Sequence, residues 1–404
     1  MKPILDHSLE AYARQRARLA GSALVADGHP YFKSVHELRE ERRARGADLV
    51  GFANYDYLGL GHDPRILEAA CRAAADYGIG AGASRLVGGE CALHARMEAA
   101  ISAFVGMEDT VGLVSGYMTN MSLIGHLLTS NDLIVADELS HNSIIAGTEL
   151  SRAQVVHFAH NDLDDLDRVL AERRPHHRRV LIVIEGLYSM DGDIPDLPGI
   201  LALKSRHDAW LLVDEAHSIG VLGARGRGLA EHWGVDPNEI DLVVGTLSKS
   251  FVSAGGFVCA RRSVCDWLRF TLPGFVYSVG LPPMIAASVI EAVAILEAEP
   301  WRLERLRENG RAFLHGARAR GLDVGLAQGI AVVPILFEDP RACMAASMRL
   351  QEQGYYAPPI VQVAVSRAAP RIRCFVCASH TSGQIEGCLD ALVEARAGIA
   401  PTPA

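Results

Sequence analysis

The sequence predicts an α/β fold, in which helices cover a mainly parallel sheet and a smaller α+β domain follows at the C-terminal end. From about Gly51, short runs of Val, Ile and Leu alternate with longer helical stretches, and these runs are almost continuously apolar. Such runs indicate strands buried on both faces, as in parallel sheets covered by helices. After Pro282-Pro283 the pattern changes to long helical stretches followed by isolated strand-like runs.

The predicted strands of the large region follow one another with helical stretches between them. Their sequences are DTVGLVS, DLIVADE, RVLIVIEGL, AWLLVDEA, DLVVGTL and GGFVCA. Four of them end in polar residues, which are Asp137-Glu138, Glu185-Gly186, Asp214-Glu215 and Thr246. The ligand crevice of an open α/β sheet lies beyond the carboxyl ends of its strands, so we expect these side chains to meet at one edge.

The chain divides by pattern into three parts. Residues 1–50 combine an amphipathic helix with a polar connection, residues 51–283 form the large domain, and residues 284–404 form the small one. In the last part we expect helices over 284–298 and 302–320, and strands within IAVVPILFE and RIRCFVCAS. A short Pro/Ala tail follows at 400–404.

Composition excludes several classes of protein. The 404 residues are 49% hydrophobic, enough for a substantial core, and the net charge of −9 argues against a nucleic-acid partner. The basic clusters ERRAR (41–45) and RRPHHRR (173–179) are predicted to be solvated loops. No signal-peptide pattern or membrane-spanning run is present, so we expect a cytoplasmic protein without membrane insertion. A single CxxC, Cys374 to Cys377, lies within a predicted strand, which argues against a metal site.

The segment WLLVDEAHSIG (210–220) fits two unrelated chemistries. In a helicase ATPase, DEAH at the end of a strand holds a magnesium ion beside a nucleotide. In a pyridoxal phosphate (PLP) enzyme, an aspartate in this position holds the protonated ring nitrogen of the cofactor. A nucleotide-hydrolysing motor also needs GxxxxGK[ST], and the sequence contains no GK[ST]. The nucleotide hypothesis is therefore rejected.

A lysine about thirty residues later supports the cofactor. In DLVVGTLSKSFVSAGG a buried strand ends near Gly245, and Lys249 follows within a run of hydroxyl and small residues. Partial burial favours the free amine that bonds to an aldehyde, and hydroxyl groups suit a phosphate. Asp214 at an earlier strand end would keep the ring nitrogen charged, and His217 follows three residues on. Together these residues predict a PLP site.

Nine motifs in order along residues 51–395 resemble those of the α-oxoamine synthases, a family of type I (aspartate aminotransferase-like) PLP enzymes. The likeness is strongest to serine palmitoyltransferase and related enzymes of secondary metabolism. The motifs are NYDYLGL (54–60), GAGASRLVGGECALHARME (80–98), SGYMTN (115–120), DELSHNSI (137–144), EGLYSMDGDIPDL (185–197), VDEAHSIGVLGARGRG (213–228), GTLSKS (245–250), YSVGLPP (277–283) and RIRCFVCASHT (371–381).

The resemblance implies a role for each matching residue. Lys249 would bind the cofactor's aldehyde and later move the α-proton, and Asp214 would pair with the ring nitrogen. His217 would hydrogen-bond the phenolic oxygen, and His141 would stack on the ring. Further cofactor contacts would come from Ser115, Gly116, Tyr117, Ser189, Thr246, Ser248 and, from a neighbouring subunit, Ser278.

The resemblance also implies a substrate pocket. Arg373 would hold the amino-acid carboxylate in a bidentate grip, and Arg371, on the same strand face, is left open as an alternative. Asp56 and Ser84 are further substrate-binding candidates. Two departures from the family pattern, Glu90 and Gly280, bear on the choice of amino acid and on the subunit contact.

The implied activity is a decarboxylating Claisen condensation of a small amino acid with an acyl thioester, in a homodimer with shared active sites. An aminotransferase or a decarboxylase on the same fold is the alternative, and the lysine argues against a non-catalytic subunit. Serine, alanine and glycine stay open, as do acyl length and the choice between coenzyme A and an acyl-carrier protein. GHPYFKSVHEL (28–38) resembles oxoamine synthase modules of polyketide assembly lines, which favours a carrier-bound acyl chain.

Overall fold

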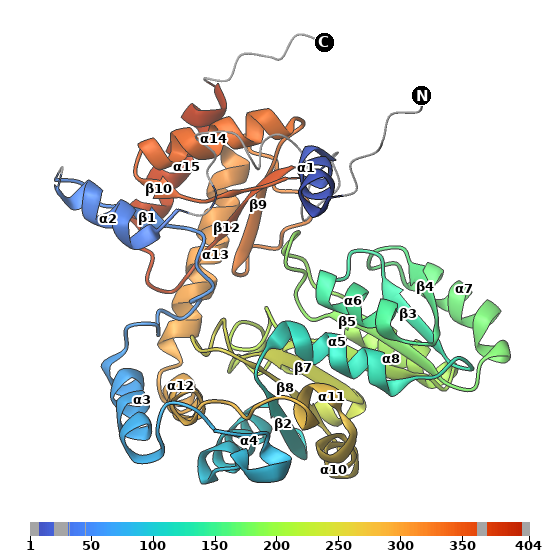
Figure 1. The fold of residues 1–404 in the computed structure, drawn as a ribbon. Helices are drawn as coiled ribbons and strands as arrows, with labels where there is room; N and C mark the ends of the chain where they lie inside the picture. The colour runs from blue at the N-terminus through green and yellow to red at the C-terminus, as the bar shows by residue number, and fades with distance from the viewer. Residues whose placement is uncertain (1–7, 20–30, 32, 45, 362–369, 398–404) are drawn as a thin grey trace. The chain divides into compact units, whose positions relative to one another are not determined.

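The computed structural model describes residues 8–19, 31, 33–44, 46–361 and 370–397 (Figure 1). The chain forms two compact units: the larger takes in residues 55–308 and 377–379, and the smaller takes in the remaining residues. Helix α13 (Trp301–Ala319) passes from the larger unit to the smaller between Glu308 and Asn309. The domain limits predicted at residues 50 and 283 stay a prediction.

The larger unit is built on a seven-stranded sheet with the order β2-β8-β7-β6-β5-β3-β4. Its strands are β2 (Asp109–Leu113), β3 (Leu133–Asp137), β4 (Gln154–Phe158), β5 (Val180–Glu185), β6 (Trp210–Asp214), β7 (Leu242–Thr246) and β8 (Gly256–Ala260). Strand β8 is antiparallel to both of its neighbours, and all other neighbouring pairs are parallel. The predicted α/β fold with a mainly parallel sheet is confirmed.

Six of the seven strands coincide with the predicted apolar runs, and only β4 was not predicted. The inner strands β3 and β5 are buried along their whole length, as expected for strands covered on both faces. Strand β4 lies at the edge of the sheet and exposes Gln154 and His157. It therefore lacks the continuous apolar run by which the other strands were recognised.

Helices cover both faces of this sheet. One face packs in a common core with four helices, α5 (Gly116–Leu127), α6 (Asn142–Leu150), α10 (Arg262–Thr271) and α11 (Pro273–Val276). The crossovers through α7 (Leu163–Arg173) and α8 (Leu197–Arg206) run across the sheet in the opposite direction to that through α6. Because such crossovers are right-handed, α7 and α8 lie on the other face. Helices α3 (Pro64–Tyr77), α4 (Ala92–Val105), α9 (Leu229–Trp233) and α12 (Pro283–Ala298) complete the unit.

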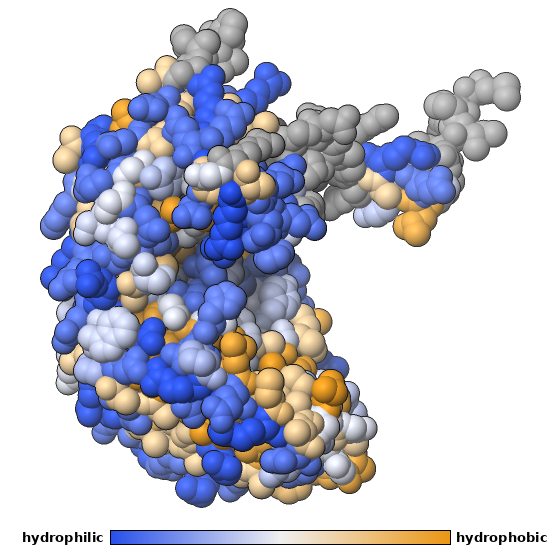
Figure 2. Space-filling view, turned by 90° about the vertical axis from the view of Figure 1, so that its left-hand side faces the viewer, coloured by the Kyte–Doolittle hydropathy of each residue, from blue (hydrophilic) through white to orange (hydrophobic). Residues whose placement is uncertain are grey.

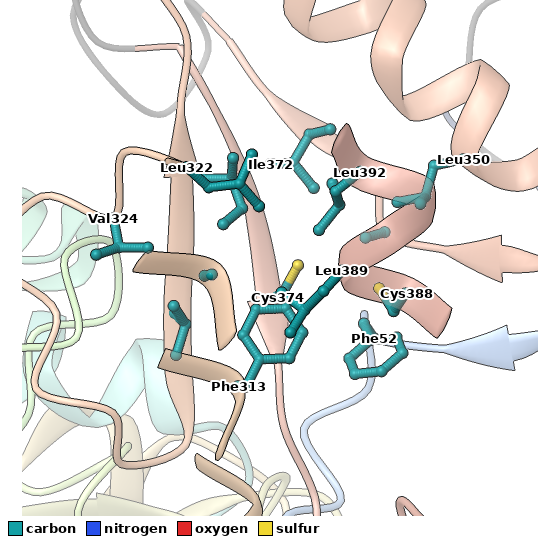
Figure 3. Close-up of a cluster of buried hydrophobic side chains, with 14 of the residues drawn as sticks. Phe52, Phe313, Leu322, Val324, Leu350, Ile372, Cys374, Cys388, Leu389 and Leu392 are labelled. Atoms are coloured by element: carbon teal, nitrogen blue, oxygen red, sulfur yellow. The ribbon is translucent and has the colours of Figure 1, made fainter. Parts of the chain in front are cut away.

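The smaller unit contains an antiparallel sheet with the order β11-β12-β9. Its core packs Phe52 and Phe313, whose ring centroids are 5.6 Å apart, near Cys374 and Leu389 (Figure 3). The remaining elements are β9 (Val332–Leu336), α14 (Pro340–Glu352), β11 (Pro359–Ile360), β12 (Arg371–Phe375), α15 (Ser382–Ala397) and a parallel pair formed by β1 (Val50–Gly51) and β10 (Tyr355–Tyr356). The strands and helices predicted over residues 284–404 are confirmed, and the first of these helices, α12, belongs to the larger unit.

The N-terminal region contains two helices, α1 (Leu9–Leu19) and α2 (Val35–Ala44), where the sequence predicted one helix and a polar connection. Most of the ERRAR cluster ends α2 and is not a solvated loop. Arg42 donates to the carbonyl oxygens of Gln351 at 3.3 Å and Glu352 at 3.0 Å, so it anchors this helix to the end of α14. Residues 28–30, 32, 45 and 400–404, which include parts of two predicted segments, lie outside the described residues.

The second basic cluster, RRPHHRR, forms the surface connection between α7 and β5. Arg174 is held there by the carbonyl oxygens of His207 at 2.7 Å and His177 at 2.9 Å. No helix within the described residues has both the length and the apolar character needed to cross a membrane. Across the same residues, no group of three or more His, Cys, Asp or Glu side chains forms a candidate metal site.

Candidate active site

A pocket of about 590 Å³, a volume that includes open solvent, lies at the carboxyl edge of the sheet in the larger unit. The ends of β5, β6 and β7 and the N-terminal turns of α5 and α6 contribute to its lining. Eight of the residues predicted from the sequence line it: Gly116, Tyr117, His141, Asp214, His217, Thr246, Ser248 and Lys249. Three of the four predicted strand ends, those of β5, β6 and β7, therefore meet at this edge.

Asp214 is buried at the end of β6, and both of its carboxylate oxygens accept hydrogen bonds. Oδ1 accepts from the backbone N–H of Ala216 at 2.9 Å, and Oδ2 accepts from Asn120 Nδ2 at 2.6 Å. Asn120 also donates to Ser143 Oγ at 3.0 Å. These bonds fix the orientation of a buried carboxylate, which can then present its charge to a cationic partner in the pocket.

The two histidines of the pocket are each oriented by a hydroxyl group. His217 Nδ1 lies 2.6 Å from the hydroxyl oxygen of Tyr57, a fully buried residue. His141 caps the N-terminus of α6, and its Nδ1 lies 2.8 Å from Ser143 Oγ. The backbone N–H of His141 donates to Glu185 Oε1 at 2.6 Å. Both rings are therefore held in place by partners from other elements or from their own helix turn.

Lys249 lies in a tight loop after β7. The loop is closed by hydrogen bonds from Leu247 N to Gly255 O at 3.0 Å and from Val252 N to Lys249 O at 2.9 Å. Val252 has a φ of 46°, a left-handed conformation that is rare for a β-branched residue and is a form of backbone strain found at functional sites. Lys249 Nζ lies 5.8 Å from the centroid of the Tyr55 ring.

The start of α5 and the end of β7 together form a cradle for an anion. Helix α5 begins at Gly116, and Thr246 Oγ1 lies 2.8 Å from Ser248 Oγ. A Cβ atom added at Gly116 would come within 2.6 Å of Thr246 Oγ1, so only glycine leaves this space open. Backbone N–H groups at a helix N-terminus, with neighbouring hydroxyl groups, are typical of phosphate sites.

The residues present in the pocket fit PLP. The cradle suits its phosphate, the buried carboxylate of Asp214 suits a protonated ring nitrogen, and the amine of Lys249 suits its aldehyde. The pocket thus offers a matching group for each reactive or charged part of the cofactor.

The other predicted residues lie outside the pocket lining. Ser115 caps α5 and accepts from Met118 N at 3.3 Å. Asp56 holds the turn that follows it, because its two carboxylate oxygens accept from the backbone N–H groups of Leu60 at 2.7 Å and Gly61 at 2.8 Å. Ser84, Ser189 and Ser278 lie in the larger unit, whereas Arg371 and Arg373 lie on β12 of the smaller unit. The roles of all these residues stay predictions.

Four residues of the site were not singled out from the sequence: Tyr57, Asn120, Ser143 and Glu185. All of them lie within the quoted motifs. Glu185 was recognised only as the polar end of a strand. The contacts of the others depend on tertiary approach between elements, for which the sequence gives no direct signal. Glu90, one of the departures from the family pattern, pairs with Arg85 Nε at 2.5 Å.

Asp137, which ends β3, points to a different cluster from the one predicted. It lies 2.9 Å from Nδ1 of His160, and Asp193 lies 2.9 Å from Nε2 of the same ring. Burial disfavours the charged imidazole, but the hydrogen bonds to the two carboxylates outweigh it and raise the pKa of His160 to about 10. His160 therefore joins the end of β3 to the loop after β5.

We expect His160→Leu to lower the free energy of unfolding by about 3–5 kcal/mol, because it leaves two buried carboxylates without their cation. The raised pKa makes this contribution complete below about pH 6.5, and the contribution is lost as the pH rises through about 10. Urea unfolding at pH 6.5 and pH 10 measures it, with His157→Leu on the exposed edge strand as the control. An equal loss of unfolding free energy from both substitutions would contradict a stabilising role for His160 between Asp137 and Asp193.

The sequence matches the family model described as aminotransferase class I and II over residues 47–392. It is 39% identical over 396 residues to an 8-amino-7-oxononanoate synthase of Methylorubrum extorquens, with 98% of each chain covered. It is 34% identical over 368 residues to a serine palmitoyltransferase of Bacteroides ovatus, with 91% of this chain and 93% of the relative covered.

A lysine-to-alanine variant of a serine palmitoyltransferase from S. paucimobilis, solved with a bound PLP–myriocin aldimine, matches the fold with a TM-score of 0.83 at 33% sequence identity. The match covers 87% of this chain and 88% of that one. Both the sequence and the arrangement of the pocket therefore lead to the same group of enzymes. The chain belongs to the class I and II aminotransferase family and, within it, to the α-oxoamine synthases, which use pyridoxal 5'-phosphate.

Proposed function

We propose that the protein condenses a small amino acid, which is serine, alanine or glycine, with an acyl thioester. The products are an α-amino ketone, carbon dioxide and a free thiol. The observation that carries this proposal is the meeting of Lys249, Asp214, His217 and His141 with an anion cradle in one pocket. The near full-length likeness to an 8-amino-7-oxononanoate synthase and a serine palmitoyltransferase supports it.

Bound PLP would supply an electron sink for the negative charge that develops at the α-carbon of the amino acid. The carboxylate of Asp214, fixed by Asn120, keeps a positive charge on the ring nitrogen favourable. Lys249 is the amine placed to take the proton from the α-carbon and to return one later, a general acid–base role that contributes about 10²–10⁴-fold in rate. His217, fixed by Tyr57, would hydrogen-bond the phenolic oxygen of the cofactor, and His141, fixed by Ser143, would lie against its ring.

We expect Gly116→Val to weaken PLP binding by about 10- to 100-fold, because the new side chain displaces Thr246 or the start of α5 and removes charge-assisted hydrogen bonds. Titration of the apoprotein with PLP, followed by intrinsic fluorescence, measures the affinity. Gly383→Val is the matched control, since a Cβ atom there, in the first turn of α15, meets nothing within 4 Å. Unchanged affinity for PLP in Gly116→Val would contradict the assignment of the start of α5 as the phosphate site.

A substrate panel tests the proposed reaction. Purified protein with PLP is mixed with serine, alanine or glycine and with thioesters of coenzyme A or of an acyl-carrier protein, at several acyl lengths. We expect release of free thiol together with a product whose mass is that of the α-amino ketone. A keto acid or an amine formed from the amino acid without any thioester would contradict the proposal and favour an aminotransferase or a decarboxylase.

The homodimer is part of the proposal and is supported by an exposed apolar surface of the larger unit. Tyr277 is 86% exposed, Val87 83% and Ile79 73%, and the segments that carry them are joined by a hydrogen bond from Gly280 N to Ala83 O at 3.0 Å. Figure 2 shows hydrophobic side chains gathered on the face of this unit that it displays. Large exposed apolar patches are typical of interfaces. Light scattering that gave the mass of one 43.5 kDa chain would contradict it.

A role for Ser278 belongs to the same proposal. The family resemblance assigns it to the phosphate site of the neighbouring subunit, and its position between the exposed side chains of Tyr277 and Val279 is compatible with a place at the proposed interface. A cytoplasmic location is also proposed. It is supported by five cysteines that are buried as ordinary core residues, which are Cys259, Cys265, Cys343, Cys374 and Cys388.

A further inference from the structure

Glu185 is a buried acid of the pocket to which the proposed reaction gives no role. It ends β5, is 3% exposed and lines the pocket. In the sheet it is the direct register partner of Asp214 on β6. Two carboxyl groups therefore lie at the ends of neighbouring strands, in the same dry part of the site.

Glu185 holds the backbone of two loops that carry predicted site residues. Its Oε1 accepts from the backbone N–H of His141 at 2.6 Å, and its carboxyl group also accepts from the backbone N–H of Ser189. His141 belongs to the connection between β3 and α6, and Ser189 to the loop after β5. One side chain thus fixes both loops at the pocket.

The ionisable groups that face Glu185 come from three other places in the fold. Asp214 lies on β6, Lys249 in the loop after β7, and Tyr188 in the loop after β5. His141 contacts it through the backbone, and Glu215 follows Asp214 directly after the end of β6. Burial, followed by the negative charge of Asp214, outweighs the backbone N–H groups of His141 and Ser189 and the charge of Lys249, which favour the ionised form, and raises the pKa of Glu185 to about 8. Like charges in a buried site disfavour each other, so the carboxylate of Asp214 opposes the ionisation of Glu185.

We propose that Glu185 is a positioning residue that works as a neutral carboxyl group. In this form it accepts the two backbone N–H groups and leaves the negative charge beside the cofactor's ring nitrogen to Asp214. Ionisation of Glu185 adds a second negative charge to the pocket and draws the ammonium form of Lys249 toward itself, away from its work as a base. The part of this inference that concerns turnover rests on the proposed function.

Glu185→Gln tests the neutral form, because an amide has the shape of a protonated carboxyl group and keeps an acceptor oxygen. We expect its turnover to stay within about threefold of wild type at pH 7, since its hydrogen bonds are retained. Wild-type turnover is expected to decline above pH 8, where Glu185 ionises, and in Glu185→Gln this decline is expected to move to higher pH. Glu185→Ala removes the acceptor and is expected to lower turnover by about tenfold or more at every pH. If Glu185→Gln were as impaired as Glu185→Ala, or kept the wild-type alkaline decline, the inference would be overturned.

A measurement on the apoprotein tests the protonation without any substrate. Because the folded pKa of about 8 lies above the ordinary value of 4.5, the contribution of Glu185 to stability is complete below about pH 4.5 and is lost as the pH rises through about 8. We therefore expect the thermal midpoint of Glu185→Gln to fall less between pH 5 and pH 8.5 than that of wild type. An identical fall in both proteins would overturn the neutral form.

Glu215→Gln is the matched control. Glu215 is also fully buried and its pKa is raised to about 7, mainly by burial, but its partners are Leu229 N and Ser218 outside the pocket lining. It should flatten the pH dependence of stability and leave the alkaline decline of turnover where it is. If no substrate is turned over while Glu185→Gln still flattens the stability profile, the proposed reaction fails and the neutral form of Glu185 stands.

Discussion

Lys249→Ala is expected to abolish turnover, with a loss of about 10³-fold or more. The variant has no amine at the pocket to bond to the aldehyde of PLP or to move the α-proton. The cofactor is nevertheless expected to stay bound, because the start of α5, Thr246 and the carboxylate of Asp214 are untouched by the substitution. Loss of rate with retention of the cofactor distinguishes a chemical role from a structural one.

Two measurements check this result. Turnover is followed by thiol release, and PLP content by absorbance after gel filtration. Borohydride treatment followed by peptide mass spectrometry should find the added mass of the cofactor on the peptide spanning residues 246–251 of wild type only. Lys204→Ala is the control, since Lys204 is a partly buried lysine of α8 that pairs with Asp241 at 2.9 Å, away from the pocket. Full activity in Lys249→Ala would refute the assignment of the lysine.

Asp214→Asn is expected to lower turnover by about 10²–10³-fold, the range in which single electrostatic groups of active sites act. Asparagine can still accept from the backbone N–H of Ala216, but its amide carries no negative charge. A neutral group beside the ring nitrogen no longer favours the protonated ring, so the ring withdraws electrons less strongly. The ratio of kcat/KM values for variant and wild type measures the effect directly.

The control for this substitution is Asp132→Asn. Asp132 is also fully buried, but it lies at the amino end of β3, whereas the pocket lies at the carboxyl ends of the strands. Asp132 accepts from the backbone N–H of Thr129 at 2.8 Å and from its hydroxyl group at 2.7 Å. We expect Asp132→Asn to lower the thermal midpoint and to leave kcat/KM unchanged. A similar loss of kcat/KM in both variants would mean that Asp214 acts through stability alone.

The sheet and its functional edge were predictable because buried strands have a recognisable apolar sequence pattern. Strands covered on both faces must be apolar throughout, so β3, β5, β6 and β7 stand out, as do the polar residues where they end. Strand β4 is covered less completely, and its exposed Gln154 and His157 break the apolar run. Helix α2 was missed for a similar reason, because its many charged residues form no apolar stripe. Its end is instead held by carbonyl groups that are distant in the sequence.

Within the site, the predictable residues are those whose own chemistry is distinctive. A lysine after a buried strand and an aspartate at a strand end suggest a function before any contact is known. Asn120, Ser143 and Tyr57 are ordinary polar residues until the fold brings them to Asp214 and the histidines. Asp137 shows the opposite limit, because it satisfies the same pattern as Asp214 and yet turns to His160.

Helix α5 has a consequence for how the site tolerates change. Its first residue, Gly116, lies at the anion cradle, and Asn120, one turn further on, holds Asp214. Four residues of helix rise about 6 Å, so a single rigid turn sets the distance between the anion cradle and the residue that holds Asp214. Inserting one residue there would swing the amide about 100° round the axis. The site therefore tolerates substitutions on the exposed side of this turn more readily than a change in the number of its residues.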